Sequence, residues 1–262
     1  MGIMKISIIG AGAFGTALGG VLANKGFDID FYDTRVEKER LSDVLLGARA
    51  VVLCVPSAAA PYVLPHLPKD VSLVVATKGI LSDAAFNEFS DWMVLSGPGF
   101  AEDIKRALPT HLTATDQRVV EMFGTEYLDF DLTDDRRGVL MCGALKNVYA
   151  IWAGYLNLKP VSREHRQFLH RVSLEMAEVL EHNGAQGETV QMNCGVGDLK
   201  ITCGLPSRNY EYGQRLRTDI HATPDKTVEG LSAIRRIKRG EIKVPSSAEY
   251  LQEILAESEK WN

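Results

Sequence analysis

Three observations predict that the chain folds as an α/β domain of the Rossmann type with a parallel-rich sheet, followed by an all-α domain. A glycine-rich loop follows the first apolar run, short β-rich runs alternate with helical patterns up to about Asp134, and the rest of the chain is patterned almost entirely as helix. Strands that alternate with helices are typical of a parallel sheet with crossover helices. We therefore expect a dinucleotide-binding domain over residues 1–134 and a helical substrate and catalytic domain over residues 135–262.

The individual elements follow from runs of apolar residues and from the breakers between them. We expect strands at residues 5–10, 28–32, 50–55, 73–76, 93–96, 111–115 and 127–130, with a helix at 16–25. Gly26, Pro56 and Gly79 fall between elements, where glycine and proline are common. In the second half we expect helices at residues 136–157, 163–183, 188–193, 209–217, 226–239 and 247–257.

The composition is that of an ordinary globular protein, with 45% hydrophobic and 24% charged residues. A net charge of −5 argues against a general nucleic-acid binder, which needs an excess of Lys and Arg. Four cysteines, Cys54, Cys142, Cys194 and Cys203, form no close pair, so we expect free thiols in a reduced cytoplasm. The N-terminal residues lack the pattern of a signal peptide, which also favours a cytoplasmic protein.

The longest apolar stretch, residues 139–158, has the length of a membrane span. However, Lys146 and Asn147 lie in its middle, and a central lysine costs about 2.5–3.5 kcal/mol on insertion. Gly143 and Gly154 add flexibility to the same stretch. We therefore expect a buried helix and no membrane span.

The loop Gly10-Ala11-Gly12-Ala13-Phe14-Gly15 follows an apolar strand and opens a helix, which is the context that a dinucleotide-binding loop requires. Gly10 permits a tight turn, Gly12 lets the backbone approach the pyrophosphate, and Gly15 lets the helix pack close to the strand. The N-terminus of the helix then offers free N–H groups to the anion. The loop predicts a nicotinamide cofactor.

The choice between NAD and NADP depends on two residues after the second expected strand. Asp33 can accept hydrogen bonds from the adenosine ribose hydroxyls, and its charge repels a 2′-phosphate, which favours NAD. Arg35 could instead accept that phosphate. The sequence favours NAD slightly and leaves NADP open.

Lys146 is the only charged residue between Val139 and Leu158. Buried lysines are rare unless they are paired or functional. Desolvation would lower the pKa of Lys146 and make it a usable proton donor near neutral pH, as reduction of a ketone requires. The alternative is a lysine whose side chain reaches the surface along its own helix.

Further polar residues lie in the helical half. Asn147 beside Lys146 suggests a directed hydrogen bond, and Asp198 could hold Lys146 or bind a hydroxyl group. We expect Gly195–Asp198 to form a turn that leads into a short helix carrying Thr202. Arg208 and Asn209 could bind a phosphate, because Arg offers a two-pronged set of donors; the alternative is a structural turn with a solvated Arg.

No metal site is expected. His165 and His170 are five residues apart and do not share a helical face well. Cys194 and Cys203 lack partners at zinc-ligand spacing.

Seven short motifs occur in the order found in NAD(P)-dependent glycerol-3-phosphate dehydrogenases, and the chain resembles that family over residues 5–230. The motifs are Gly10–Gly15 with Thr16-Ala17-Leu18, Ala76-Thr77-Lys78-Gly79, Ser96-Gly97-Pro98-x-Phe100-Ala101, Leu145-Lys146-Asn147, Gly197-Asp198-Leu199-x-x-Thr202-Cys203, Ser207-Arg208-Asn209 and Val228-Glu229-Gly230. The resemblance implies reversible reduction of dihydroxyacetone phosphate to sn-glycerol 3-phosphate, usually for phospholipid biosynthesis. It also implies a possible homodimer.

The resemblance assigns roles by position, with Lys146 and Asp198 as the catalytic residues and Lys146 as the general acid and base. The substrate-binding residues that it implies are Lys78, Gly97, Asn147, Thr202, Ser207, Arg208 and Asn209. The cofactor-binding residues are Gly10, Gly12, Ala13, Phe14, Gly15, Asp33, Arg35, Pro56, Lys78, Ala101, Arg208 and Glu229.

The chain departs from the family in three places and leaves two alternatives open. The segment from Asp33 to Val51 is compressed, the region after Gly230 is trimmed, and Gly99 stands where the family usually has Ser or Thr. One alternative is a reductase of a 2-keto acid such as ketopantoate, which would not need the phosphate-binding group Lys78, Arg208 and Asn209. The other is a non-catalytic dinucleotide sensor.

Overall fold

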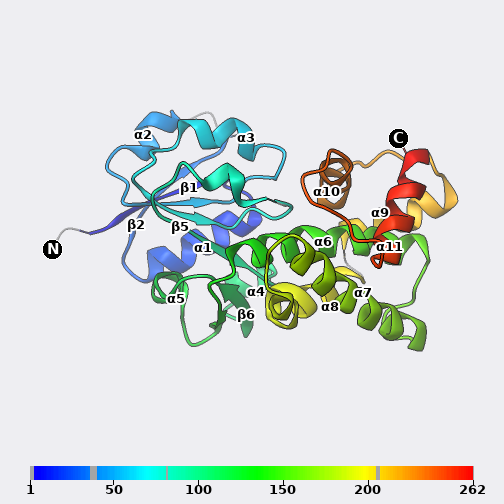
Figure 1. The fold of residues 1–262 in the computed structure, drawn as a ribbon. Helices are drawn as coiled ribbons and strands as arrows, with labels where there is room; N and C mark the ends of the chain where they lie inside the picture. The colour runs from blue at the N-terminus through cyan, green and yellow to red at the C-terminus, as the bar shows by residue number, and fades with distance from the viewer. Residues whose placement is uncertain (1–2, 36–39, 81, 205–206, 262) are drawn as a thin grey trace. The chain divides into compact units, whose positions relative to one another are not determined.

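The computed structural model describes residues 3–35, 40–80, 82–204 and 207–261. The chain divides into two compact units (Figure 1), which we call the first unit, residues 1–77 and 83–136, and the second unit, residues 78–82 and 137–262. The division thus falls between Arg136 and Arg137, and the short segment Lys78–Ser82 belongs to the second unit. The domain boundary between residues 134 and 135 stays a prediction.

The first unit is built on a seven-stranded sheet with the strand order β2-β1-β3-β4-β5-β6-β7. Neighbouring strands are parallel except β5 and β6, which are antiparallel, so the predicted parallel-rich sheet is confirmed. The strands are β1 (Lys5–Ile9), β2 (Asp28–Tyr32), β3 (Ala50–Leu53), β4 (Ser72–Val75), β5 (Trp92–Ser96), β6 (Thr110–Ala114) and β7 (Leu128–Leu132).

Helices cover both faces of this sheet (Figure 1), which explains why its central strands are apolar on both sides. One core cluster joins alternate strand residues to α1 (Ala13–Asn24), α4 (Ala101–Lys105) and α5 (Gln117–Phe123). The other face carries α2 (Leu41–Leu45) and α3 (Ala60–Val63). The 3-10 turn η1 (Leu64–His66) follows α3 in the chain, and η2 (Asp83–Phe86) lies between β4 and β5.

Helix α1 begins three residues earlier than the sequence predicts, at Ala13 rather than Thr16, with Gly12 as its N-cap. Gly15 allows this, because a Cβ at that position would lie 2.1 Å from the carbonyl oxygen of Gly10. The glycine therefore lies inside the first helical turn rather than in a loop. The last three residues of the dinucleotide loop, Ala13 to Gly15, thus form the start of the helix.

All the elements of the second unit in its described residues are helices or helical turns, which confirms the expected all-α character. Its longer helices are α6 (Arg136–Tyr155), α7 (Arg163–His182), α9 (Arg208–Thr218), α10 (Glu229–Lys238) and α11 (Glu249–Glu257). Between α7 and α9 lie the 3-10 turn η3 (Gly187–Gln191), the π-helical turn η4 (Asn193–Gly197) and α8 (Asp198–Thr202), and η5 (Ser258–Lys260) follows α11. The helix expected at 188–193 is thus a 3-10 turn, and the turn expected at Gly195–Asp198 is largely a π-helical turn that runs directly into α8.

Glycines bring α6 into backbone contact with α9. A Cβ on Gly154 would lie 2.0 Å from the carbonyl oxygen of Tyr210, and a Cβ on Gly213 would lie 1.9 Å from that of Ile151. The sequence interpretation of Gly154 as a source of flexibility is therefore wrong. Its missing side chain makes room for the neighbouring helix.

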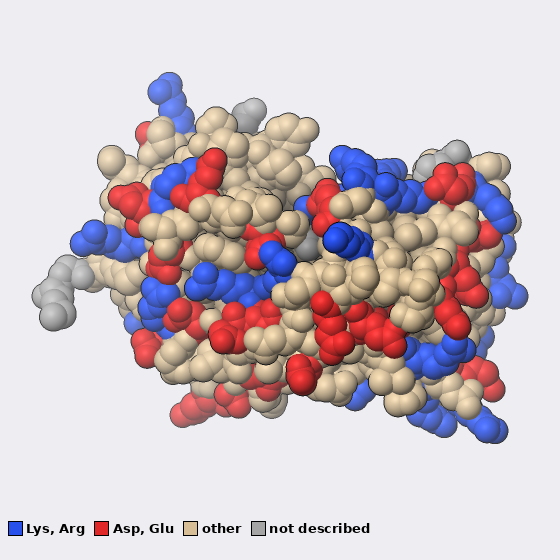
Figure 2. Space-filling model, in the orientation of Figure 1, with Lys and Arg blue, Asp and Glu red and all other residues tan. Residues whose placement is uncertain are grey.

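Among the described residues, no helix is long and apolar enough to cross a membrane. All four cysteines are free thiols, and three of them are buried. Figure 2 shows acidic and basic side chains interspersed over both units, with Lys and Arg gathered over α10, which carries Arg235, Arg236 and Lys238.

Candidate functional site

The cofactor residues expected in the first unit gather at one edge of its sheet. They follow the carboxyl ends of β1, β2, β3 and β5, which point the same way because these strands are parallel. Ligands of open α/β sheets bind at this edge. The residues are Gly10, Gly12, Ala13, Phe14 and Gly15 after β1, Asp33 and Arg35 after β2, Pro56 after β3, and Ala101 after β5. Gly97, which is expected to bind the substrate, also follows β5.

The glycine loop has the shape that a pyrophosphate requires. Gly10 has a φ of 107°, and a Cβ on it would lie 2.8 Å from the backbone of Cys54, so only glycine fits. A Cβ on Gly12 would meet open space apart from the Arg35 guanidinium at 3.8 Å. Among the described residues, no side chain caps the N-terminus of α1, and the end of a helix dipole favours an anion at this place. The loop therefore fits a dinucleotide.

Asp33 and Arg35 form a two-pronged ion pair beside this loop. Arg35 donates from Nε to Asp33 Oδ1 at 2.8 Å and from a terminal nitrogen to Oδ2 at 2.6 Å, and its backbone N–H also reaches Oδ1 at 3.0 Å. These bonds lower the pKa of Asp33 to about 2. The carboxylate is therefore ionised but already paired, whereas the Arg35 side chain is 72% exposed.

The turn after β5 contains two glycines. Gly97 has a φ of 138°, and a Cβ on it would lie 3.0 Å from the Cα of Leu112, so a side chain there would be strained. A Cβ on Gly99 would lie 3.0 Å from the Leu112 side chain and 3.4 Å from the ring of Phe14. The turn and the glycine loop are therefore in close contact within the first unit.

The second unit buries a lysine and a carboxylate together. Lys146 on α6 and Asp198 at the start of α8 are 2% and 1% exposed, and Lys146 Nζ forms an ion pair with Asp198 Oδ2. Lys78 Nζ lies 3.5 Å from the same oxygen, and Thr202 donates to Asp198 Oδ1 at 3.2 Å. The expected burial of Lys146 is confirmed, and its side chain does not reach the surface.

The two effects of this cluster on Lys146 oppose one another. Burial is the largest effect and lowers its pKa, and the nearby Lys78 lowers it too, so that the net pKa is about 8 against an ordinary 10.5. The charge of Asp198 and its hydrogen bond raise the pKa and keep part of the ammonium form. Lys146 can therefore give or take a proton close to neutral pH.

A chain of amide hydrogen bonds runs beside the buried lysine. Asn147 donates to the carbonyl of Gly143 at 3.0 Å and accepts from Asn209 at 2.8 Å. Asn209 in turn accepts from the N–H of Gly230 at 3.0 Å. These hydrogen bonds connect α6 to the starts of α9 and α10. The side-chain nitrogens of Asn147 and Asn209 each use one of their two hydrogens in them.

The remaining expected residues lie at helix starts. Ser207 caps α9 by accepting from the N–H of Tyr210 at 3.4 Å, and Glu229 is the first residue of α10. Arg208 is exposed in the first turn of α9 and has no ion pair or hydrogen bond with the described residues. Its donors are therefore available.

Comparison with known proteins places this arrangement in a family. The family model of the NAD-dependent glycerol-3-phosphate dehydrogenase C-terminus matches residues 135–257. A glycerol-3-phosphate dehydrogenase (NAD(P)+) of Rhizobium etli is 33% identical over 84% of this chain and 82% of its own length. The chain belongs to the glycerol-3-phosphate dehydrogenase family.

Other members of the glycerol-3-phosphate dehydrogenase family give the same picture. A relative from Leptospira biflexa is 34% identical over 81% of this chain and 79% of its own length. The crystal structure of a glycerol-3-phosphate dehydrogenase from Coxiella burnetii matches with a TM-score of 0.81, covering 98% of this chain and 95% of that one at 23% identity. The latter likeness shows that the fold is shared.

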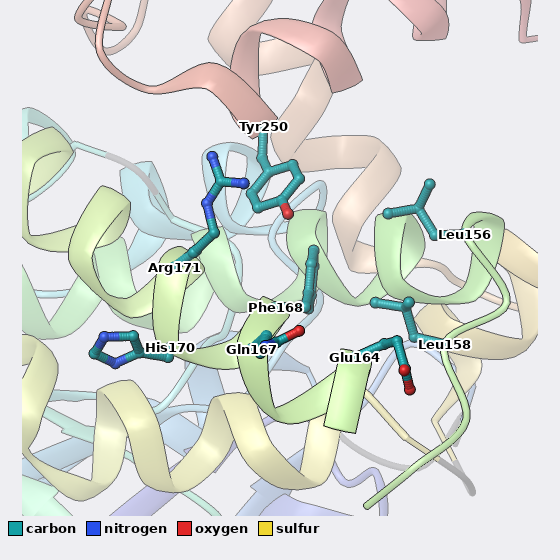
Figure 3. Close-up of a pocket in the computed structure, with 8 residues that line it drawn as sticks. All are labelled: Leu156, Leu158, Glu164, Gln167, Phe168, His170, Arg171 and Tyr250. Atoms are coloured by element: carbon teal, nitrogen blue, oxygen red, sulfur yellow. The ribbon is translucent and has the colours of Figure 1, made fainter. Parts of the chain in front are cut away.

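A surface cavity of about 420 Å³ in the second unit lies apart from the lysine cluster. Figure 3 shows the rings of Phe168 and Tyr250 side by side, with Arg171 next to Tyr250 and two leucines opposite. Arg171 also forms an ion pair with Glu249. None of the residues predicted for the site lines this cavity, so we do not assign the substrate to it.

Two further observations complete the site. No group of three or more His, Cys, Asp or Glu side chains in the described part of the chain is arranged to hold a metal ion. Ser96 belongs to one of the family motifs but has no role predicted from the sequence, and its buried hydroxyl has no hydrogen-bond partner among the described residues. A second signal in the sequence is that this hydroxyl residue ends an otherwise apolar run, directly before Gly97.

Proposed function

We propose that this chain is an oxidoreductase that interconverts dihydroxyacetone phosphate and sn-glycerol 3-phosphate with NAD(H) or NADP(H). The relatives named glycerol-3-phosphate dehydrogenase (NAD(P)+) support the reaction class. The observation that carries the proposal is the buried pair Lys146–Asp198 with Lys78 on the same carboxylate. It combines a proton donor of suitable pKa with a partly exposed positive charge.

The first unit supplies the cofactor site in this proposal. The loop from Gly10 to Gly15 and the N-terminus of α1 hold the pyrophosphate, and the cofactor when bound supplies the hydride. Asp33 faces the ribose hydroxyls, but Arg35 already neutralises much of its charge. The pair therefore weakens the repulsion that an unpaired carboxylate would exert on a 2′-phosphate, so we expect both cofactors to be accepted.

Lys146 moves the proton. In ketone reduction its ammonium group donates from Nζ to the carbonyl oxygen of the substrate, and in alcohol oxidation the neutral amine takes that proton back. Asp198 holds the ammonium group in place through their ion pair. Thr202 in turn orients Asp198 through its hydrogen bond to Oδ1.

Lys78 and Arg208 provide the charge that a phosphorylated substrate needs. The Lys78 side chain is 30% exposed, so its charge is paired but not fully buried, and Arg208 has its donors available. Arg is suited to a phosphate because its fork makes two parallel hydrogen bonds. A phosphorylated substrate should therefore be bound more tightly than its unphosphorylated analogue.

The proposal also covers the compartment and the oligomeric state. The four free thiols are what a reducing compartment maintains, so we propose that the enzyme works in the cytoplasm. A homodimer enters the proposal on the family resemblance alone.

The direct test is oxidation of NADH and NADPH in parallel, followed at 340 nm, with dihydroxyacetone phosphate as the substrate. We expect turnover with both cofactors, and a much lower kcat/KM with unphosphorylated dihydroxyacetone. Turnover of a 2-keto acid without turnover of dihydroxyacetone phosphate would instead indicate the ketopantoate-like reductase. Binding of the cofactor without turnover of any ketone would indicate a dinucleotide sensor.

The pH profile tests the role of the charges around Lys146. Because the ammonium form is needed for ketone reduction and the pKa is about 8, kcat/KM for reduction should fall as the pH rises above about 8. Asp198→Asn should move this decline to lower pH, because Asp198 raises the pKa. Lys78→Met should move it to higher pH, because Lys78 lowers the pKa. Structural damage alone would lower activity in both variants without opposite displacements, and such a result would contradict the assignment.

A further inference from the structure

Ser96 is the last residue of β5 and is only 6% exposed, yet its Oγ has no hydrogen-bond partner among the described residues. Two other buried hydroxyl groups in or next to the same sheet are paired. Ser7 donates to the carbonyl of Val44 at 2.7 Å, and Thr115 accepts the N–H of Val94 at 2.7 Å. A buried polar group without a partner is unfavourable, so its presence calls for an explanation.

The position of Ser96 indicates which ligand would supply the partner. The strands β2, β1, β3, β4 and β5 lie side by side, and Ser96 ends β5 at the same sheet edge as the glycine loop. At a strand spacing of about 4.8 Å, β5 lies about 19 Å from β2, where Asp33 is found. A dinucleotide with its adenosine ribose at β2 and its pyrophosphate at β1 extends towards β3, β4 and β5. Its nicotinamide end is therefore the part that approaches Ser96.

The chemistry of the two groups is complementary. The carboxamide of nicotinamide has a carbonyl oxygen that accepts and an NH₂ group that donates, and a serine hydroxyl can do either. The backbone that carries the hydroxyl is held by the sheet. Ser96 pairs with Thr113 of β6, and the chain turns directly afterwards at Gly97, where no side chain fits. A group on a fixed strand end is suited to orient a ring.

We infer that the Ser96 hydroxyl binds the nicotinamide carboxamide of the cofactor. The inference rests on the proposed function, since it assumes that a nicotinamide dinucleotide binds to the first unit. Ser96 would then act as a cofactor-binding residue that orients the ring. Its unpaired hydroxyl is the state expected of a group that gains its partner only when the cofactor is present.

The experiment compares whole cofactors with fragments that lack the nicotinamide ring. Binding of NADH and NADPH, and of ADP-ribose and 2′-phospho-ADP-ribose, is measured by calorimetry on the full chain and on Ser96→Ala. The variant should bind the whole cofactors about fivefold to tenfold more weakly, as loss of one hydrogen bond predicts. Its affinity for the fragments should stay within about twofold. Without cofactor, its thermal unfolding midpoint should be unchanged or higher, because the substitution removes an unsatisfied buried hydroxyl.

Ser7→Ala is the matched control, because it makes the same change at a buried hydroxyl that is already paired within the sheet. It should lower the unfolding midpoint and leave the ratio of cofactor to fragment affinity unchanged. Equal binding of the whole cofactors by Ser96→Ala and the unaltered chain would overturn the inference, as would an equal loss for cofactor and fragment. If the unaltered chain binds neither cofactor nor fragment, the proposed function itself fails.

Discussion

Replacing Lys146 by methionine should lower kcat for the reduction of dihydroxyacetone phosphate by about 10²- to 10⁴-fold, the usual contribution of a positioned proton donor. Methionine keeps the length of the side chain and fills the buried space without an ionisable group. The cofactor residues of the glycine loop belong to the other unit, so the Kd for NADH should stay within about twofold. The readouts are steady-state kinetics and calorimetric cofactor binding.

Two further variants separate the loss of a proton donor from the loss of a structural contact. Lys146→Ala leaves a cavity, and we expect small primary amines added to the assay to restore part of its activity, because they can supply the missing proton. Lys200→Ala is the control, since Lys200 lies exposed on α8 two residues from Asp198. It should keep activity within about twofold. Turnover by Lys146→Met at the rate of the unaltered enzyme would exclude Lys146 as the proton donor.

The sequence indicates that Lys146 is buried, with a side chain that reaches the surface as the alternative, because the signal is local. A single charge in a long apolar stretch has few stable placements other than a paired or functional site. The glycine loop is local in the same sense, since strand, glycines and helix follow one another within about 20 residues. The parallel-rich sheet and the helical second half follow from patterns of the same short range.

The contacts that complete the site depend on residues that are far apart in the chain. Lys78 and Asp198 are separated by 120 positions, and no periodicity relates them. Lys78 also lies in the half of the sequence that predicts strands, although its segment belongs to the second unit. The pairing of Asp33 with Arg35 is local, but on sequence alone the two residues have competing roles in cofactor choice. Only the geometry shows that the two side chains bind each other.

Glycine in a helix is the clearest case in which local reasoning points the wrong way. On propensity alone, Gly154 weakens α6, since glycine costs about 1 kcal/mol relative to alanine in a helix interior. The structure gives it a packing role, because α9 approaches α6 through the space that a side chain would fill. Only the position of the second helix reveals this, and that position is a tertiary property.

Gly213→Ala should therefore lower the free energy of unfolding by about 2–4 kcal/mol, although alanine is the better helix former. The added Cβ would lie 1.9 Å from the carbonyl oxygen of Ile151. A backbone carbonyl cannot rotate away from the added Cβ as a flexible side chain can. The two helices α6 and α9 must therefore move apart. Activity should fall as well, because α6 carries Lys146 and α9 carries Arg208. Chemical denaturation and steady-state kinetics measure the two effects.

Gly20→Ala provides the control of opposite sign. Gly20 lies in the interior of α1, and a Cβ there would meet nothing within 4 Å. Alanine should therefore raise the free energy of unfolding by about 0.5–1 kcal/mol through helix propensity and a less flexible unfolded chain. If both alanine variants stabilise the protein, α6 and α9 do not approach as closely as the structure shows. If the two variants change the free energy of unfolding in opposite directions, helix propensity decides the effect in α1 and backbone contact decides it in α9. The position of α6, which carries the buried lysine, then depends on the lack of a side chain at the α6–α9 contact.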